Sequence, residues 1–346
     1  MQLYYFFYKI SKSASRFVIL FFVFASSNLW ACELDRPIVF AGLDWQSNAF
    51  HTEVIRLILE LGLDCKTEII PGTTIPLLQG VARGDIDIVM EVWKDNVNKV
   101  WNKALDRNQV IEVGLNFSDA KQGWFIPKYM VEGDGAKAPD LISVDDLKRY
   151  SYLFSDPEEP LKGRFYNCIA GWNCEIINSA KLSAYGLNEY FTNFRPGTGV
   201  ALSAAISSAY KRKEPILAYY WEPTWLLGVY DMVAIKEPEF NSSVFKNLSI
   251  QKNPDKATAY PVLNVYIGAN KKFSEDAPQI INILKNYRTE SSLINEMLVY
   301  MYKDKVSARN VAKKFFETYP EYWRKWVDDS EYDKINVLLD ISYDRK

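Results

Sequence analysis

Four tryptophans stand where a predicted strand ends or a loop turns. Each follows a run predicted to be buried and precedes polar or turn residues; the four are Trp45, Trp93, Trp172 and Trp221. A single tryptophan is most often part of a hydrophobic core. Four at strand ends are harder to explain by packing, because the carboxyl ends of parallel strands face the same side. We therefore interpret them as walls of a binding site.

Converging indole rings can bind a methylated cation. A quaternary ammonium has no N–H group, so a carboxylate cannot hydrogen-bond to it and would be desolvated at a cost. An indole face carries negative potential and fits the methyl shell, and each contact contributes roughly 0.5–2 kcal/mol. Four contacts contribute about 2–8 kcal/mol, whereas micromolar affinity needs about 8. Methyl burial and hydrogen bonds to a polar or anionic tail must supply the rest.

Residues for catalysis are not evident in this sequence. The only histidine, His51, lies early in an apolar predicted helix, where a helix-surface or partly buried histidine is the ordinary interpretation. There is no Gly-x-Ser-x-Gly elbow, no phosphate-binding Gly-Lys-Ser/Thr loop and no His-Glu-x-x-His helix. Asp85 and Asp87 share one face of a predicted strand, but solvated strands give the same pattern. We expect no enzyme, no catalytic residue, no cofactor and no metal site.

The four cysteines predict two disulfides. Cys168 and Cys174 are separated by a short loop containing Gly171, which favours a bond between them. Cys32 and Cys65 remain, each just before a predicted strand, and neighbouring parallel strands would bring them together. Zinc is the alternative, but the sequence lacks Cys-x-x-Cys spacing and has one histidine.

The first 31 residues are typical of an export signal. Basic residues between positions 9 and 16 precede the apolar run 17–25, which is too short to span a bilayer comfortably. Cleavage after Ala31 would leave Cys32 first, within a stretch that resembles a bacterial lipoprotein box. Trp30 is too large for its usual place in that box, so a lipid on Cys32 is the alternative to a disulfide. We predict a periplasmic protein.

The net charge excludes a nucleic-acid surface. It is −2 for the whole chain, from 41 basic and 43 acidic residues, and about −5 without the three basic residues of the signal. Apolar residues make up 48% and charged residues 24%, as in an ordinary soluble globular protein. We expect a monomer.

Strands and helices alternate after the signal. Buried runs predict strands, and apolar residues at helical spacing predict helices. The predicted strands cover 37–43, 66–70 and 85–92, the helices cover 50–62 and 73–83, and 45–48 forms a turn. A second region follows, with helices at 144–149, 176–185 and 200–211 and a strand at 215–220, and 278–346 is mostly helical. Such alternation favours parallel sheets with crossover helices.

Extended segments at 123–131 and 261–269 connect these two regions. We therefore predict an α/β fold of two lobes with a central mixed, mainly parallel sheet in each. Lobe 1 comprises 32–125 plus 263–346, and lobe 2 comprises 126–262. Ligands in such sheets bind outside the carboxyl ends of the strands, which here face the cleft between the lobes.

From Pro37 to Trp326 the chain resembles the glycine betaine/choline substrate-binding proteins of ABC importers. The resemblance rests on four motifs in this order: Gly84-Asp85-Ile86-Asp87…Glu91-Val92-Trp93, Gly123-Trp124-Phe125-Ile126-Pro127, Gly171-Trp172-Asn173-Cys174 and Tyr219-Tyr220-Trp221-Glu222-Pro223-Thr224-Trp225. It implies a hinged two-lobe periplasmic-binding-protein fold, type II-like, that closes on its ligand and docks on a membrane permease.

The resemblance also implies residue roles. One tryptophan from each of three motifs forms the cage: Trp93, Trp172 and Trp221. Backbone N–H groups of Asn173 and Cys174 would hold a ligand carboxylate, and the disulfide to Cys174 would reduce the ordering cost of that loop. Choline-type members use an additional tryptophan, which falls on Trp45.

Three positions leave the ligand open. Some betaine binders have a histidine where this chain has Val97, so the tail needs another donor. Choline binders carry an aspartate where this chain has Ser47, which weakens the case for choline. Trp124, in the hinge segment, is either a fifth wall of the site or core.

The function that follows is capture of a quaternary-ammonium compound for import, with glycine betaine as first choice. Trimethylamine N-oxide, carnitine, proline betaine, choline and sulfonium analogues share the methylated head and are not ranked by the sequence. The alternatives are an enzyme on the same two-lobe fold acting on a methylated amine or cofactor precursor, and a sensor domain of a transport system.

Overall fold

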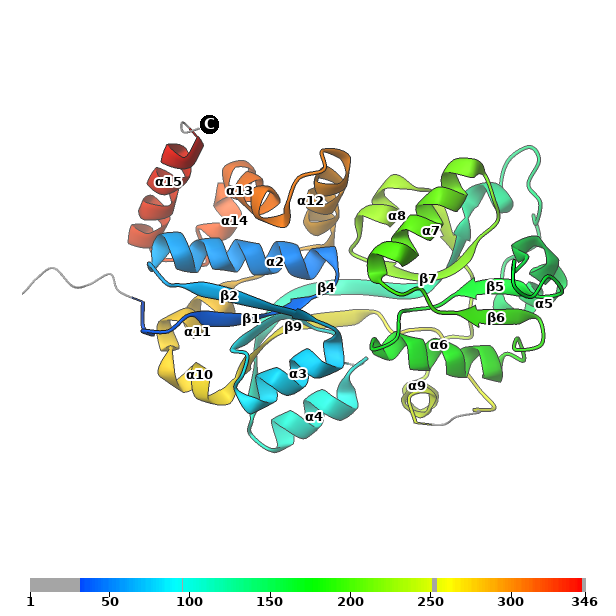
Figure 1. The fold of residues 1–346 in the computed structure, drawn as a ribbon, viewed down its shortest axis with the longest axis horizontal. Coiled ribbons are helices and arrows are strands. Elements are labelled where there is room, and N and C mark those ends of the chain that lie inside the picture. Colours follow the sequence, from blue (N-terminus) through cyan, green and yellow to red (C-terminus); the bar gives the residue numbers. More distant parts are fainter. Residues whose placement is uncertain (1–31, 95, 251–253, 344–346) are drawn as a thin grey trace, which may run out of the picture.

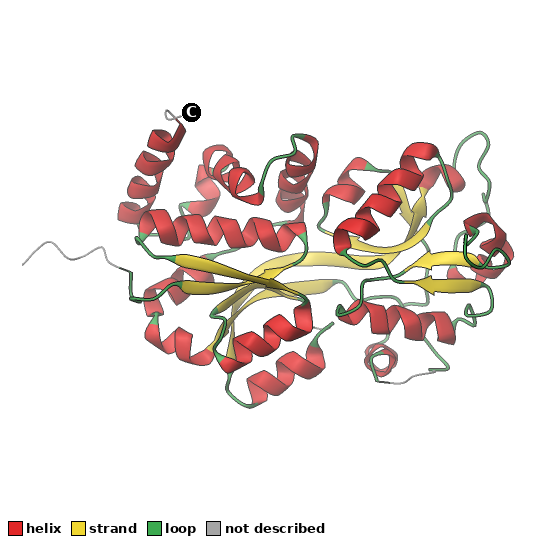
Figure 2. Ribbon diagram, in the orientation of Figure 1, coloured by secondary structure: helices red, strands yellow, loops and turns green. Residues whose placement is uncertain are grey.

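The computed structural model describes residues 32–94, 96–250 and 254–343. The predicted export signal, 1–31, lies outside these residues. Figure 1 shows two lobes side by side, joined by long strands that run from one lobe into the other. Helices cover both faces of the strands, as Figure 2 shows.

Lobe 1 is built around three parallel strands and their crossover helices. The strands are β1 (Ile38–Leu43), β2 (Thr67–Gly72) and β3 (Ile88–Val92), with β1 in the centre. The helices are α2 (Gln46–Leu57), its π-helical continuation η1 (Ile58–Gly62), α3 (Thr74–Arg83) and α4 (Asn98–Asp106). All of β3 is buried, as expected for a strand covered on both faces. The alternating pattern predicted from the sequence is confirmed here.

Two long strands carry the chain between the lobes. β4 (Val110–Pro127) pairs antiparallel with β9 (Leu263–Asn270) as far as Ala120, and with β7 (Leu217–Glu222) from Lys121 onward. Within the described residues, nine strands form one sheet in the order β2-β1-β3-β9-β4-β7-β5-β6, with β8 (Met232–Ala234) beside β4. The outer pairs are parallel and the central pairs antiparallel, which makes the sheet mixed.

Lobe 2 adds two short parallel strands and several helices to β7. The strands are β5 (Gly163–Tyr166) and β6 (Phe191–Phe194). The α-helices are α5 (Leu147–Tyr150), α6 (Asn173–Ala184), α7 (Gly199–Arg212), α8 (Trp225–Val229) and α9 (Ser242–Leu248). Short 3-10 helices are η2 (Lys128–Met130), η3 (Val144–Asp146) and η4 (Ser151–Phe154).

The chain returns to lobe 1 and ends in helices. They are α10 (Lys271–Asp276), α11 (Pro278–Asn286), α12 (Ser291–Lys303), α13 (Ala308–Thr318), α14 (Pro320–Trp323) and α15 (Asp329–Tyr343). Of these, α12 and α13 pack on α2. Phe315 of α13 packs edge-on against Phe50 of α2, with ring centroids 5.7 Å apart. Among the described residues, no helix is long and apolar enough to cross a membrane.

This cover buries His51, which the sequence analysis placed on a helix surface or partly buried. The side chain is fully buried, and its Nδ1 lies 2.6 Å from the hydroxyl of Tyr287. The earlier interpretation was wrong because it considered one apolar face of α2, whereas sheet and C-terminal helices bury two.

Both predicted disulfides are present. Parallel pairing of β1 with β2 places the residues before each strand side by side, and Cys32 and Cys65 are bonded with Cα atoms 4.9 Å apart. A sulfur in a disulfide cannot carry a thioether-linked lipid, which favours the disulfide for Cys32. Cys168 is bonded to Cys174 across the short loop.

Some predicted boundaries were wrong. α2 begins at Gln46, so 45–48 is no turn; Asn48 is buried and donates to the carbonyl of Ala41 in β1. α6 begins at Asn173, three residues before the predicted start, which makes Trp172 its N-cap residue. In both helices the first turn is polar, and hydrophobic spacing alone does not reveal such a start.

Candidate functional site

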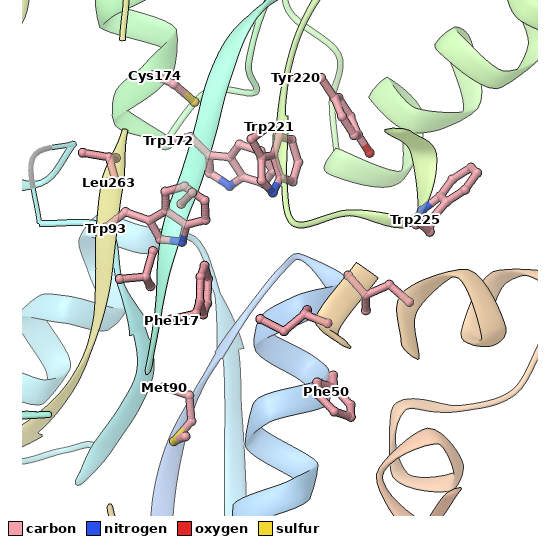
Figure 3. Close-up of a cluster of buried hydrophobic side chains, with 14 of the residues drawn as sticks. Phe50, Met90, Trp93, Phe117, Trp172, Cys174, Tyr220, Trp221, Trp225 and Leu263 are labelled. Atoms are coloured by element: carbon pink, nitrogen blue, oxygen red, sulfur yellow. The ribbon is translucent and has the colours of Figure 1, made fainter. Parts of the chain in front are cut away.

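The four tryptophans converge on one cavity between the lobes. Trp45 precedes α2 and Trp93 follows β3, both in lobe 1, whereas Trp172 precedes α6 and Trp221 lies in β7, both in lobe 2. All four line a cavity of about 50 Å³. Figure 3 shows three of the rings close together, with Cys174 beside them. The strand-end positions read from the sequence thus meet in space.

Trp172 occupies the centre of this cluster. Its ring centroid lies 5.5 Å from Trp45 at 83° and 5.1 Å from Trp221 at 80°. Such edge-to-face contacts place the positive edge of one ring on the negative face of another. Trp172 therefore meets two aromatic neighbours, one in each lobe, at right angles.

A hydrogen bond to Trp172 crosses between the lobes. Its Nε1 donates to Oδ1 of Asp44, the residue before Trp45, at 2.8 Å. Burial raises the pKa of Asp44, while the bond from the indole opposes that shift. The lobes also approach at Gly171, φ 95°, where a Cβ would lie 3.1 Å from Oγ1 of Thr73. Glycine is suited to this position because it accepts a positive φ and leaves room for the other lobe.

A buried carboxylate stands behind the lobe 1 tryptophans. Oε2 of Glu91 accepts hydrogen bonds from Nε1 of Trp45 at 2.8 Å and from Nε1 of Trp93 at 2.9 Å. The side chain is fully buried, and burial raises its pKa to about 7 against the opposing effect of these hydrogen bonds. Its Oε1 has no hydrogen-bond partner within the described part of the chain; Ser47 is close but outside hydrogen-bond geometry.

Polar groups also line the cavity. The first turn of α6 contributes Asn173 and Cys174, and the Cys168–Cys174 disulfide ties this turn to the preceding loop. Facing it are two amide side chains: Asn96 Nδ2 donates to Gln122 Oε1 at 3.0 Å. The hydroxyl of Tyr219 donates to the same oxygen at 2.6 Å, which leaves the NH₂ group of Gln122 with donor capacity. A helix N-terminus and amide donors suit an anionic or polar group.

Trp124 does not line this cavity. It is fully buried against lobe 2, where its ring packs 4.4 Å from Phe165 and its Nε1 donates to Asn178 at 2.8 Å. Trp124 shares a strand face with Gln122, two residues earlier, but lies deeper under α6. Of the two alternatives left open for Trp124, a fifth wall of the site or core, this position favours core.

Several lining or supporting residues were missed from the sequence: Asp44, Thr74, Glu91, Asn96, Gln122 and Tyr219. Glu91 could have been predicted from the sequence, because it lies two residues before Trp93 on one strand face. Asn96 and Gln122 gave no signal, since their contact depends on how a loop folds back over β4.

A larger cavity of about 470 Å³ adjoins the first and shares Trp45 and Trp221 with it. Its walls include Ser47, which places that residue outside the smaller cavity. Among the described residues, no group of histidine, cysteine and acidic side chains could hold a metal ion.

Comparison with known proteins agrees with this geometry. Residues 36–318 match the family model of the substrate-binding domain of ABC-type glycine betaine transport systems. The glycine betaine-binding periplasmic protein OusX of Dickeya dadantii is 25% identical over 67% of this chain and 70% of its own length. The trimethylamine N-oxide-binding protein of Pelagibacter ubique is 23% identical over 91% of this chain and 98% of its own.

Solved structures share the fold. The glycine betaine/L-proline-binding protein of Borrelia burgdorferi superposes with a TM-score of 0.70 at 19% identity, covering 87% of this chain and all of its own. The lactococcal OpuAC protein in its closed form with glycine betaine gives 0.67 at 16% identity, covering 85% and 100%. The family match covers most of the chain and the fold agrees. The chain belongs to the family of substrate-binding domains of ABC-type glycine betaine transport systems.

Proposed function

We propose that this protein captures glycine betaine, or a closely related quaternary-ammonium compound, in the tryptophan-lined cavity and delivers it to an ABC permease. The convergence of four indole rings from both lobes on one cavity carries the proposal. The related proteins named above bind glycine betaine or trimethylamine N-oxide by their descriptions, and both compounds have a methylated cationic head.

In this proposal the head and tail of the ligand meet different walls. The methylated head lies among Trp45, Trp93, Trp172 and Trp221, and takes the place of the edge-on contacts that Trp172 now makes. The tail carboxylate accepts from the backbone N–H groups of Asn173 and Cys174. Asn96 and Gln122 face that turn and supply the donors that Val97, which also lines the cavity, lacks.

The remaining properties follow from this role. The protein is exported by residues 1–31, acts as a periplasmic monomer and binds without turnover. The lobes comprise 32–125 plus 263–346 and 126–262, and they close around the ligand by bending where β4 changes partner from β9 to β7.

Calorimetry with a panel of ligands tests the proposal. The panel is glycine betaine, proline betaine, carnitine, choline, trimethylamine N-oxide and a sulfonium analogue. We expect micromolar binding of at least one, and recovery of that ligand chemically unchanged. Trp172→Ala should weaken binding by about 2 kcal/mol or more, about 30-fold, since it removes the central ring.

A matched pair of variants separates site from core. Trp172→Phe changes the central ring, whereas Trp124→Phe makes the same substitution in the core beside Phe165 and Asn178. Only the first should weaken binding, with thermal unfolding showing that both variants fold. Unchanged affinity in Trp172→Ala would remove the site assignment.

A further inference from the structure

Glu91 contacts the walls of the cage rather than its interior. A single oxygen of this carboxylate receives the N–H groups of two of the four indoles, Trp45 and Trp93. These two rings come from different elements, the start of α2 and the end of β3. The shared acceptor fixes the in-plane orientation of both, so Glu91 sets which parts of the rings face the cavity.

No cation neutralises Glu91 within the described part of the chain. Its one close basic neighbour is His51, whose Nε2 lies 3.9 Å from Oε1, with both side chains fully buried. Burial lowers the pKa of His51 to about 3, so this imidazole is neutral at physiological pH. Burial also raises the pKa of Tyr287, on the far side of His51, well above its ordinary value, so the phenol is uncharged. The nearest acid of the cage, Asp44, bonds to Trp172 instead.

Other buried acids of the molecule have partners for their charge or for both carboxylate oxygens. Asp87, on the same stretch of chain, pairs with Arg36 at 2.7 Å. Glu237 pairs with Lys181 at 2.7 Å. Glu331 accepts hydrogen bonds on both carboxylate oxygens, from Gln279 and from the backbone N–H of Asp328. A buried charge that is neither paired nor fully hydrogen-bonded is unfavourable, so Glu91 calls for a cation from elsewhere. Glu91 lies behind the tryptophan-lined cavity, and the proposed function places a cationic head group in that cavity.

An anion at this position strengthens cation binding in two ways. It attracts a positive ligand directly, and the attraction is large because the site is shielded from water. An indole whose N–H donates to an anion is also polarised, which makes its face more negative and improves its contact with a cation. Neither effect acts on a neutral molecule of the same shape.

We propose that Glu91, acting through Trp45 and Trp93, makes this cage select a cationic head group over an uncharged head group of equal size and shape. The proposal rests on the proposed function, since it assumes that the methylated head lies among the tryptophans. Glu91 is a positioning and selectivity residue that does not touch the ligand. In the empty protein it is partly protonated near pH 7, and a bound cation drives it to the ionised form.

The test compares ligand pairs that differ only in head charge. Glycine betaine is paired with 3,3-dimethylbutyrate, and choline with 3,3-dimethylbutanol, in which carbon replaces the charged nitrogen. The wild-type protein should prefer the charged member of a pair. Glu91→Gln keeps an oxygen acceptor for both indoles but removes the charge, and should reduce that preference by about tenfold or more. The affinity for the member with the uncharged head should stay within about threefold.

Asp87→Asn is the matched control. It makes the same acid-to-amide change on the same stretch of chain, at a carboxylate that contacts Arg36 and not the cage. The preference for the charged ligand should be unchanged in this variant. A loss in both variants would assign the effect to disturbed folding and overturn the proposal.

A second measurement uses the unaltered protein, so it does not depend on a variant folding. Calorimetry near pH 7 in buffers of different ionisation enthalpy reports protons released on binding. The ligand with the cationic head should release a fraction of a proton, because it lowers the pKa of Glu91, which lies near 7 in the empty site, and the analogue with the uncharged head should release none. No release, or an unchanged preference in Glu91→Gln, overturns the role of Glu91 while the binding function stands. Failure of the wild-type protein to bind any methylated cation overturns the proposed function itself.

Discussion

Two buried carboxylates, one in each lobe, are held in opposite ways. In lobe 2, Asp156 accepts from Nε and a terminal nitrogen of Arg164 at 3.1 and 2.8 Å, from the backbone N–H of Glu158 at 2.7 Å, and from the hydroxyl of Thr192. In lobe 1, Glu91 accepts two indole N–H groups on one oxygen and none on the other. The hydrogen bonds of Arg164 lower the pKa of Asp156, whereas burial raises that of Glu91 to about 7.

The difference separates a carboxylate that serves the fold from one that serves the site. Asp156 ties together β5, β6 and the loop that precedes β5, and its charge is compensated within the protein. Glu91 leaves part of its hydrogen-bonding capacity and all of its charge uncompensated, which weakens the empty protein and favours a positive ligand. Three predictions test this contrast.

The largest effect is expected from Asp156→Ala. The change leaves Arg164, whose side chain is 11% exposed, without its partner and should lower the free energy of unfolding by about 3–5 kcal/mol. Ligand affinity should not change. Urea unfolding and calorimetry measure the two quantities. Glu158→Ala is the control, because this exposed acid lies 3.8 Å from the same guanidinium and should contribute little.

A pH-dependent gain is expected from Glu91→Gln. The pKa of Glu91 is raised from 4.5 to about 7 on folding, so its stabilising effect is complete below 4.5 and is lost as the pH rises through 7. The raised pKa corresponds to about 3 kcal/mol. The variant should match the wild-type protein at pH 4 and exceed it by about that amount at pH 8, in urea unfolding without ligand. Parallel stability curves for the two proteins would contradict the raised pKa.

The pH dependence of stability that Asp156 causes has the opposite sign. The pKa of Asp156 is lowered on folding, so the carboxylate stabilises the protein above pH 3.8, its ordinary pKa. This stabilisation is lost as the pH falls below that value. The two carboxylates therefore act in separate pH ranges, and their effects can be measured independently.

The smallest effect is expected from Thr192→Val. This change removes one neutral donor from Asp156 while Arg164 remains, so the free energy of unfolding should fall by about 1 kcal/mol. A loss as large as that of Asp156→Ala would show that the hydroxyl, and not the guanidinium, holds the carboxylate.

The sequence predicted best what depends on neighbours along the chain. The strand ends carrying Trp93 and Trp221 follow from local patterns of buried residues, and parallel pairing of β1 and β2 brought Cys32 to Cys65. The burial of His51 did not follow, because Tyr287 lies 236 residues away. The pair Asn96 and Gln122 and the core position of Trp124 likewise depend on how loops and α6 settle over β4. Such distances are set by packing, which hydrophobic spacing does not encode.

The bond from Trp172 to Asp44 joins a wall of the proposed site to the opposite lobe. Opening the lobes must break this hydrogen bond, so the indole that lines the proposed site also holds the two lobes together. Under the proposed function, closure on the ligand would set the distance between the outer surfaces of the two lobes. A membrane partner that contacts both lobes would then recognise the loaded protein from that distance, without access to the ligand itself.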